Sequence, residues 1–334
     1  LIMSIILTGD RPTGPLHLGH YVGSLENRVK LQDQHTQYLL IADNQALTDN
    51  MSDPNKVKNN IIEVAKDYLA AGIDPSKTTI CVQSALPAIS ELTLLYLNFV
   101  TVSRLERNPT IRDEIKSRNF GRDIPAGFLT YPVAQAADIT AFLADLVPVG
   151  ADQSPLIEQA NEVVKRINHQ VGEAILPNIN ALYSDVSRLP SLDGKTKMSK
   201  SLGNTISLYS SVDDLKKSIN AMFTDPDHLK VTDPGKVEGN VVFTYLDAFD
   251  DDKNMLFDLK NHYKQGGLGD SIVKKRLLEI LESKLAPIRE KRLQLNNDHE
   301  FVMSILKNGT DIANQVTQET LIMIKKRLGI FSFT

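Results

Sequence analysis

The chain has 334 residues, 42% of them apolar and 23% charged, with a formal net charge of −4 at neutral pH. This composition supports an ordinary packed core, and the length predicts about two domains. The longest apolar stretch, residues 141–149, is interrupted by Asp145 and Pro148, which excludes the roughly 20 apolar residues of a membrane-spanning helix. A single cysteine, Cys81, excludes an internal disulfide. Since the first residues also lack the pattern of a signal peptide, we expect a soluble cytoplasmic protein.

The charge is distributed unevenly along the chain. Residues 270–334 hold 11 lysines and arginines against 8 aspartates and glutamates, whereas the rest of the chain is acidic. A basic C-terminal part next to an otherwise acidic protein is compatible with RNA binding by that part. It also fits a solvated helical surface, which charge alone favours, so both interpretations stay open at this point.

Strand and helix signals alternate in the N-terminal part. Three short apolar runs predict β-strands: residues 4–7, 38–42 and 79–82. Between the last two, Asp53 can cap a helix, Pro54 occupies its first position and Gly72 ends it. Strands separated by helices form parallel βαβ units. We therefore expect an α/β fold with a Rossmann-like, doubly wound parallel sheet in a catalytic domain over residues 1–211.

The second half of the chain is mostly helical in pattern. From Ile89 to about Gly172 the helical signals predict an insertion in the sheet domain, and residues 178–192 are rich in turns. From Val212 onward helical periodicity continues almost to the end. We expect a C-terminal all-helical domain over residues 212–334, with a boundary near residues 209–212.

The first predicted strand leads into a Pro- and Gly-rich turn, GDRPTGPLHLGH, at residues 9–20. We expect a helix to begin at about Leu18, and a helix N-terminus after the first strand is an anion site. His17 and His20 are three residues apart, so both can face one side and donate hydrogen bonds to phosphate oxygens. Gly19 leaves bare backbone against which a flat base can lie. A paired metal site or two solvent-facing histidines are the alternatives, and no cysteine or third histidine lies nearby to complete a metal site.

A second motif lies about 180 residues later, in the sequence DGKTKMSKSLG at residues 193–203. Two lysines and two serines between glycines predict a mobile loop rich in hydrogen-bond donors, which suits a triphosphate. An ordinary basic surface loop is the commoner meaning of such a string on its own. The joint occurrence of this string and the histidine motif in one chain is much less often a coincidence.

Together the two motifs resemble the signatures of the class I aminoacyl-tRNA synthetases. Three segments look like the tryptophanyl branch of that family, and the resemblance covers essentially the whole chain: residues 9–24, 129–138 and 147–153. The resemblance implies that ATP activates L-tryptophan to tryptophanyl-AMP, which then charges tRNA(Trp). It also implies Mg²⁺ bound through the nucleotide with no protein metal site, a homodimer formed through the helical region after Ile89, and anticodon binding by the C-terminal helices. Lys274, Lys275 and Arg276 are candidates for contacts to the RNA phosphates.

The resemblance also implies which residues handle ATP. An amino-acid carboxylate, with a pKa of about 3.5, is already ionised, so activation needs positioning and charge neutralisation and no general base. Four residues are implied to be catalytic: His17, His20, Lys197 and Lys200. Contacts to ATP are implied for Arg11, Pro12, Thr13, Gly19, His20, Gly150, Ala151, Asp152, Leu189, Lys197, Met198, Ser199, Lys200 and Ser201.

A pocket for tryptophan needs one hydrogen-bond acceptor and otherwise apolar walls, because the indole N–H is only a donor. The resemblance assigns Asp138 as that acceptor, and a buried structural carboxylate paired with an arginine is the alternative for this residue. It also assigns apolar walls and contacts to the α-amino end. The walls are Leu7, Ile139, Val147 and Val149, and the amino-end contacts are Tyr131 and Gln153.

Three positions depart from the pattern of the tryptophanyl branch. Arg11 stands where many relatives carry glutamine, and Gln45 stands where some carry histidine near the adenosine. Ala151 replaces a common glutamate, which removes a side chain that could orient Asp152, the residue that the resemblance places on the ribose.

Three other functions share parts of this pattern. A tyrosyl-tRNA synthetase usually offers the phenol both a donor and an acceptor and has a Gly-Gly step before the Asp-Gln pair, whereas this chain has VGADQ at residues 149–153. A small-molecule adenylyltransferase or ligase rarely carries a helical extension of this length. An inactive RNA-binding paralogue is disfavoured because both motif histidines and both motif lysines are intact.

Overall fold

The computed structural model describes residues 3–118, 120, 123–150, 153–183, 189–196, 198 and 203–331. Its centre is a sheet of five parallel strands in the order β3-β2-β1-β4-β5. The strands are β1 (Ile5–Asp10), β2 (Thr36–Ile41), β3 (Thr78–Val82), β4 (Leu146–Val149) and β5 (Asn180–Tyr183). The strand order reverses direction at β1 and β4, which is where open α/β sheets bind ligands. The predicted Rossmann-like sheet is confirmed.

The helices of the sheet region lie between and after the strands. They are α1 (Leu18–His20), the π-helical turn η1 (Tyr21–Leu25), α2 (Glu26–Leu31), α3 (Asp43–Leu47), α4 (Pro54–Ala70), α5 (Pro87–Tyr96), α6 (Val102–Glu106), α7 (Pro109–Arg118), α8 (Ala126–Ala141) and α9 (Ser154–Val171). In α4 the Asp53 side chain accepts the Lys56 N–H at 3.2 Å, and Gly72 just beyond the helix has φ of +108°. The predicted boundaries of this helix are confirmed.

The elements described between Ile89 and Gly172 are helices apart from β4, which pairs with both β1 and β5. Helix α9 is therefore the crossover between β4 and β5, and the segment inserted between β3 and β4 ends with α8. Helical periodicity could not reveal β4, because it spans only four residues and is paired on both sides.

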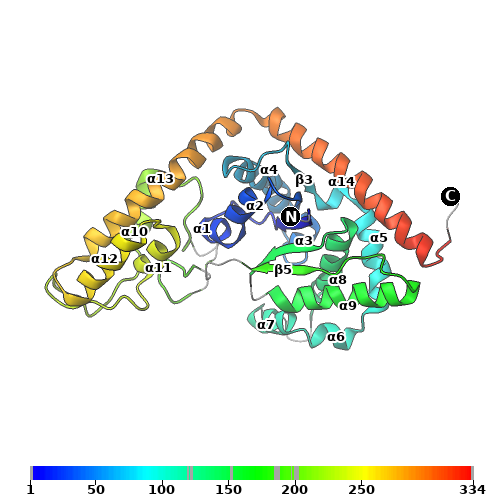
Figure 1. The fold of residues 1–334 in the computed structure, drawn as a ribbon, viewed down its shortest axis with the longest axis horizontal. Helices are drawn as coiled ribbons and strands as arrows, with labels where there is room; N and C mark the ends of the chain where they lie inside the picture. The colour runs from blue at the N-terminus through cyan, green and yellow to red at the C-terminus, as the bar shows by residue number, and fades with distance from the viewer. Residues whose placement is uncertain are drawn as a thin grey trace.

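The C-terminal helices fall into two groups. Helices α10 (Val212–Asn220), α11 (Val241–Phe249) and α12 (Lys253–Gln265) gather along α13 (Asp270–Asn296), whereas α14 (His299–Arg327) returns to the sheet. Figure 1 shows α13 and α14 as the two arms of an arch above the sheet. No helix in the described part of the chain is long and apolar enough to cross a membrane.

Helix α14 covers the open edge of the sheet at β3. A Cβ atom on Gly309 would lie 2.0 Å from the carbonyl oxygen of Ile80, so only glycine allows this close approach. The next residue, Thr310, accepts the Val82 N–H through its hydroxyl at 3.2 Å. The helix thus satisfies part of a strand edge that would otherwise be unpaired.

Candidate active site

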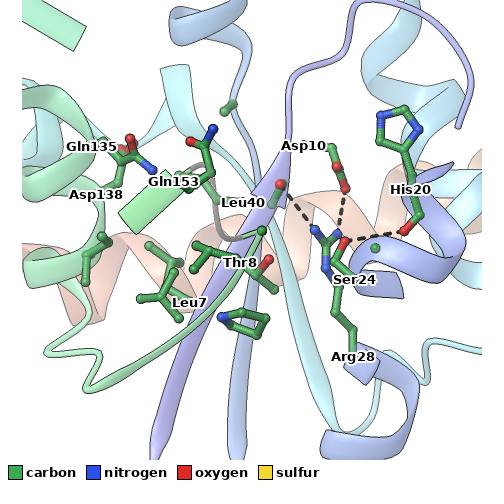
Figure 2. Close-up of a pocket in the computed structure, with 18 of the residues that line it drawn as sticks. Leu7, Thr8, Asp10, His20, Ser24, Arg28, Leu40, Gln135, Asp138 and Gln153 are labelled. Carbon is green, nitrogen blue, oxygen red and sulfur yellow. Dashed lines mark hydrogen bonds and ion pairs between the residues drawn. The ribbon is translucent and has the colours of Figure 1, made fainter. Parts of the chain in front are cut away.

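A cleft opens at the carboxyl ends of β1 and β4, where the strand order reverses. It consists of two adjoining cavities of about 710 and 690 Å³, which share lining residues that include Asp10, His20, Gln135 and Gln153. The first cavity has an apolar part beside β1 and β4, and the second is lined mostly by polar side chains. Figure 2 shows Asp138, Gln135 and Gln153 on one side of β1, with Asp10, Arg28 and His20 on the other.

Most residues predicted to bind tryptophan meet in the first cavity, which is lined by Leu7, Asp138, Ile139, Val147, Val149 and Gln153. Tyr131 lines neither cavity. It is 7% exposed and packs in a separate apolar cluster beside Phe128, with 5.8 Å between the ring centroids.

Asp138 lies at the apolar end of this cavity and is only 4% exposed. The side-chain amide of Gln83 donates to both of its oxygens, at 2.8 and 3.0 Å. Burial raises the pKa of Asp138 to about 7, although the Gln83 hydrogen bond acts in the opposite direction. The partner that holds this carboxyl group is thus an amide and not the arginine considered as an alternative.

Sequence reasoning missed two glutamines of this site. Gln83 follows β3 directly, and a polar residue at the carboxyl end of a parallel strand is a signal that could have identified it. Gln135 lines both cavities, and its Oε1 atom is buried without a hydrogen-bond partner in the described part of the chain. An acceptor in that position can receive a hydrogen bond from a ligand.

The two motif histidines form a capping box at the start of α1. The Nδ1 atom of His17 accepts the Gly19 N–H at 3.1 Å, and the Nδ1 atom of His20 accepts the His17 N–H at 3.2 Å. Because each Nδ1 is an acceptor, the proton of each neutral ring lies on Nε2, which is therefore the donor atom of the ring. The predicted helix start at Leu18 is confirmed, and no group of three metal-ligating residues occurs in the part of the chain described.

A buried ion pair lies beneath His20. The Arg28 guanidinium is 2.6 Å from the Asp10 carboxylate, which also accepts the Tyr68 hydroxyl at 2.8 Å. Burial alone would raise the pKa of Asp10, but the Arg28 guanidinium holds that pKa well below its usual range. The pair fixes the end of β1, from which the histidine turn departs. Sequence analysis did not identify Asp10 or Arg28 as site residues.

The structure brings the two signature motifs together. A Cβ atom on Gly19 would lie 2.9 Å from the sulfur of Met198, so the second motif approaches the bare backbone of the first. At the start of the second motif, Asp193 accepts hydrogen bonds from Ser191 Oγ at 2.5 Å and from the Thr196 N–H at 3.0 Å. These bonds lower the pKa of Asp193 and close the turn before Lys197.

The other residues predicted to bind ATP are placed as follows. Arg11, Thr13, His17, His20 and Met198 line the second cavity, Gly19, Gly150 and Leu189 line the first, and Pro12 is buried and lines neither. The Arg11 guanidinium also forms an ion pair with Asp49. Six residues of the prediction lie outside the described residues: Ala151, Asp152, Lys197, Ser199, Lys200 and Ser201.

Comparison with known proteins gives a consistent set of relatives. The family described as tRNA synthetases class I (W and Y) matches residues 3–286. The tryptophan--tRNA ligase of Clostridium longisporum is 56% identical and that of Streptococcus agalactiae serotype V is 51% identical, each over 98% of both chains. The crystal structure of tryptophanyl-tRNA synthetase from Campylobacter jejuni, complexed with ADP and tryptophan, superposes with a TM-score of 0.84 at 31% identity. That match covers 98% of this chain and 100% of the other.

Proposed function

This chain belongs to the class I tRNA synthetases for tryptophan and tyrosine, and we propose that the cleft at β1 and β4 is where it activates L-tryptophan. Its overall reaction is tryptophan--tRNA ligation: tryptophan is activated with ATP and joined to a transfer RNA. The observation that carries the assignment of the site is Asp138, a buried acceptor at the end of an apolar cavity.

The apolar half of the cleft suits an indole ring. Asp138 keeps oxygen lone pairs beyond the two that Gln83 occupies, so it can accept the indole N–H while apolar side chains cover the ring faces. The unpaired Oε1 of Gln135 and the side chain of Gln153 lie at the junction with the polar half. We assign these two amides to the α-ammonium group of the substrate.

The polar half of the cleft suits the phosphates of ATP. The tryptophan carboxylate attacks the α-phosphorus, the bond from that phosphorus to the bridging oxygen breaks, and pyrophosphate leaves. The Nε2–H groups of His17 and His20 can donate to phosphate oxygens, and Lys197 and Lys200 add positive charge. The approach of Met198 to Gly19 supports this assignment, because Met198 lies between the two lysines in the sequence.

Magnesium would enter this site with the nucleotide. Mg²⁺ commonly keeps several waters and binds to substrate phosphates, so the nucleotide itself would supply most of its ligands. Its chemistry there would be to neutralise phosphate charge.

The transfer of the activated residue involves the RNA and, we propose, the C-terminal helices α10–α13. A hydroxyl of the terminal ribose of the RNA attacks the carbonyl carbon of tryptophanyl-AMP, and AMP leaves. Within α13, Lys274 donates to the Asn220 carbonyl at 2.7 Å, and Arg276 donates two hydrogen bonds to Asp250. Lys275, in contrast, is exposed. Lys275 is therefore the best placed of these three residues to contact a phosphate.

We also propose a cytoplasmic homodimer that pairs through the segment inserted between β3 and β4. Two apolar side chains in that segment face solvent, Leu94 at 67% exposure and Val102 at 60%. A protein partner that covered both side chains would remove this apolar surface from water.

The test of the site and the specificity is pyrophosphate exchange into ATP, measured with each of the twenty amino acids in turn. We expect exchange with L-tryptophan far above the others. Exchange that depended on tyrosine would instead assign the cleft to a phenol.

A further inference from the structure

The backbone of the histidine motif is anchored to helix α4. The Leu16 N–H donates to Oδ2 of Asp67 at 2.7 Å, across 51 residues of sequence. Both residues are only 1% exposed, and Leu16 directly precedes His17. The position of the motif is therefore set by a buried carboxylate of another element as well as by its own turn.

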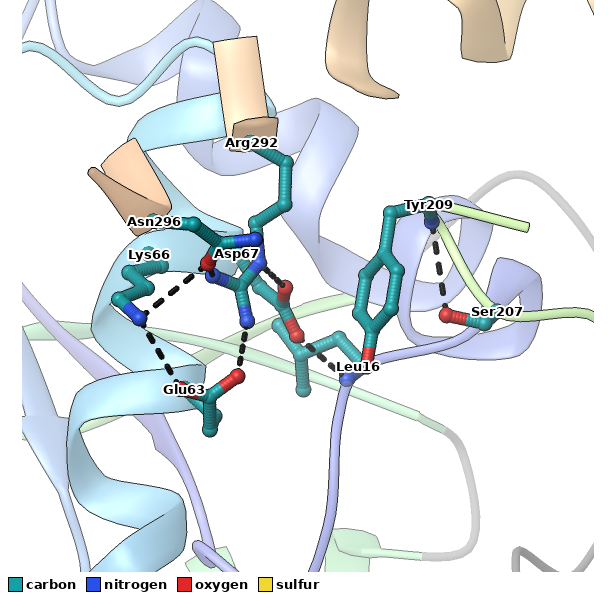
Figure 3. Close-up of polar contacts among 8 residues, drawn as sticks. All are labelled: Leu16, Glu63, Lys66, Asp67, Ser207, Tyr209, Arg292 and Asn296. Atoms are coloured by element: carbon teal, nitrogen blue, oxygen red, sulfur yellow. Dashed lines mark hydrogen bonds and ion pairs between the residues drawn. The ribbon is translucent and has the colours of Figure 1, made fainter. Parts of the chain in front are cut away.

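The second oxygen of Asp67 binds the long helix α13. The Nε atom of Arg292 donates to Oδ1 of Asp67 at 2.9 Å, and Arg292 is 2% exposed. The remaining nitrogens of this guanidinium donate to Asn296, at 2.6 Å, and to Glu63. Figure 3 shows Asp67 between Arg292 and the Leu16 backbone. One carboxylate thus connects the C-terminal helices with the histidine motif.

The segment that follows the second motif meets the same junction. Residues 206–208 run beside residues 16–18, with Leu18 N–H donating to the Ile206 carbonyl at 2.9 Å and an antiparallel bridge between His17 and Ser207. The ring of Tyr209 lies under the Arg292 guanidinium, 5.0 Å from its carbon to the ring centroid. One turn earlier on α13, Arg289 donates to the Ser210 carbonyl at 2.7 Å. Helix α13 therefore contacts the segment after the second motif directly, and it reaches the histidine motif through Asp67.

From these contacts we propose that Asp67 and Arg292 are positioning residues for amino-acid activation, and this inference rests on the proposed function. They hold the backbone before His17 and the segment after the lysine motif in one fixed relation to α13. A buried ion pair adds little stability over an apolar pair of the same shape, so its value lies in geometry. A shift of about 1 Å in a catalytic group lowers the rate by about 100-fold, which is why such an anchor affects turnover.

The chain offers a matched control for this junction. Asp250 is 2% exposed, holds Arg276 of α13 at 3.0 Å through two bonds, and accepts the backbone N–H of Asp252 at 3.0 Å. It thus resembles Asp67 in burial, in its arginine partner and in its backbone bond. The difference is that the backbone bond of Asp250 stays within the C-terminal helices.

The experiment compares Asp67→Asn, Arg292→Lys and Asp250→Asn with the wild type in tryptophan-dependent pyrophosphate exchange. An asparagine cannot accept both the Arg292 and the Leu16 hydrogen bonds with equal geometry, because one of its two terminal atoms is a donor. We expect Asp67→Asn to lower kcat at least about 10-fold, with KM for tryptophan changed by less than about twofold. Arg292→Lys keeps the positive charge but loses the planar set of guanidinium donors, so it should also lower kcat. This second variant tests the proposal even if Asp67→Asn lowers the folded fraction. Asp250→Asn should retain the wild-type kcat.

The outcomes distinguish a failure of the proposed function from a failure of the positioning role. A wild-type chain without tryptophan-dependent exchange would overturn the proposed function. An active wild type with unchanged kcat in both Asp67→Asn and Arg292→Lys would overturn the positioning inference alone. Equal losses of kcat in Asp67→Asn and Asp250→Asn would also overturn it, because a general loosening of α13 would then explain both.

Discussion

The side-chain amide of Gln83 donates to both carboxylate oxygens of Asp138, while its own carbonyl oxygen accepts the Gln45 N–H at 3.1 Å. This one side chain therefore connects α8 to α3 beside the cavity that Asp138 lines. Gln83 is 3% exposed, so its bonds are shielded from water.

Replacement of Gln83 by methionine should weaken tryptophan binding about 5- to 10-fold, because Asp138 then loses the amide that orients it. Isothermal titration with L-tryptophan measures the effect. Gln37→Met is the matched control, since Gln37 is also buried and bonds Thr78 at 3.0 Å but lines neither cavity. Equal affinities of the two variants would show that the Gln83 amide does not orient Asp138 for the ligand.

The chain contains no tryptophan, so a bound tryptophan would contribute the only indole fluorescence. We expect its emission to shift when the wild-type chain is titrated, because the ring moves into an apolar cavity. Asp138→Ala should lower the affinity by about 5- to 150-fold, since the indole N–H then loses its acceptor at a cost of about 1–3 kcal/mol. Undiminished affinity of this variant would remove Asp138 from recognition.

The raised pKa of Asp138 predicts how stability depends on pH. In the unfolded chain this carboxyl group loses its proton near its usual pKa of 3.8, whereas in the folded chain it keeps the proton to about pH 7. Between these values the folded state binds more protons, so this group lowers the free energy of unfolding as pH rises, by at most about 1.4 kcal/mol per pH unit.

Asp138→Asn cannot ionise, so its free energy of unfolding relative to the wild type should increase from pH 4 to pH 7 and level off above. Urea unfolding of both proteins across this range measures the difference. Parallel pH profiles of the two proteins would contradict the burial of an ionisable group at this position.

Gln135 is predicted to bind the α-ammonium group of the substrate through its unpaired Oε1. Gln135→Leu should therefore lower the affinity for L-tryptophan by about 5-fold or more. The affinity for indole-3-propionate, which lacks the ammonium group, should stay nearly unchanged. Competition binding with the two ligands gives the comparison. If the affinities for both ligands fall equally, Gln135 shapes the pocket and does not contact the ammonium group.

Replacement of Lys197 or Lys200 by alanine should lower the rate of activation by about 100- to 1,000-fold, the scale for losing one preorganised donor in the transition state. Binding of ATP without chemistry should weaken much less, since the charge that these lysines neutralise develops during the reaction. Single-turnover formation of tryptophanyl-AMP and equilibrium binding of ATP measure the two quantities. A variant with nearly normal activation would exclude that lysine from the mechanism.

The sequence by itself determined the features that depend on neighbouring residues. Asp53, Pro54 and Gly72 predicted helix α4 because capping and left-handed backbone are local properties. The spacing of His17 and His20 predicted a shared turn for the same reason, although not that the two rings would cap that turn themselves. The two motifs together were specific enough to indicate the family, and with it a candidate set of tryptophan-binding residues, of which Tyr131 lines neither cavity.

Only the tertiary structure decided which distant residues support that site. Gln83 reaches Asp138 across 55 residues, and Asp67 joins Leu16 to Arg292, which lies 225 residues further along the chain. No periodicity encodes such pairs, because they arise from the order of strands in the sheet and from the crossing of α13 over α4. The return of α14 to the edge of β3 is of the same kind, since the glycine that permits it reads in sequence as a weak point in a helix. The requirement for glycine at position 309 comes from the carbonyl group of Ile80, which occupies the place that a side chain would take.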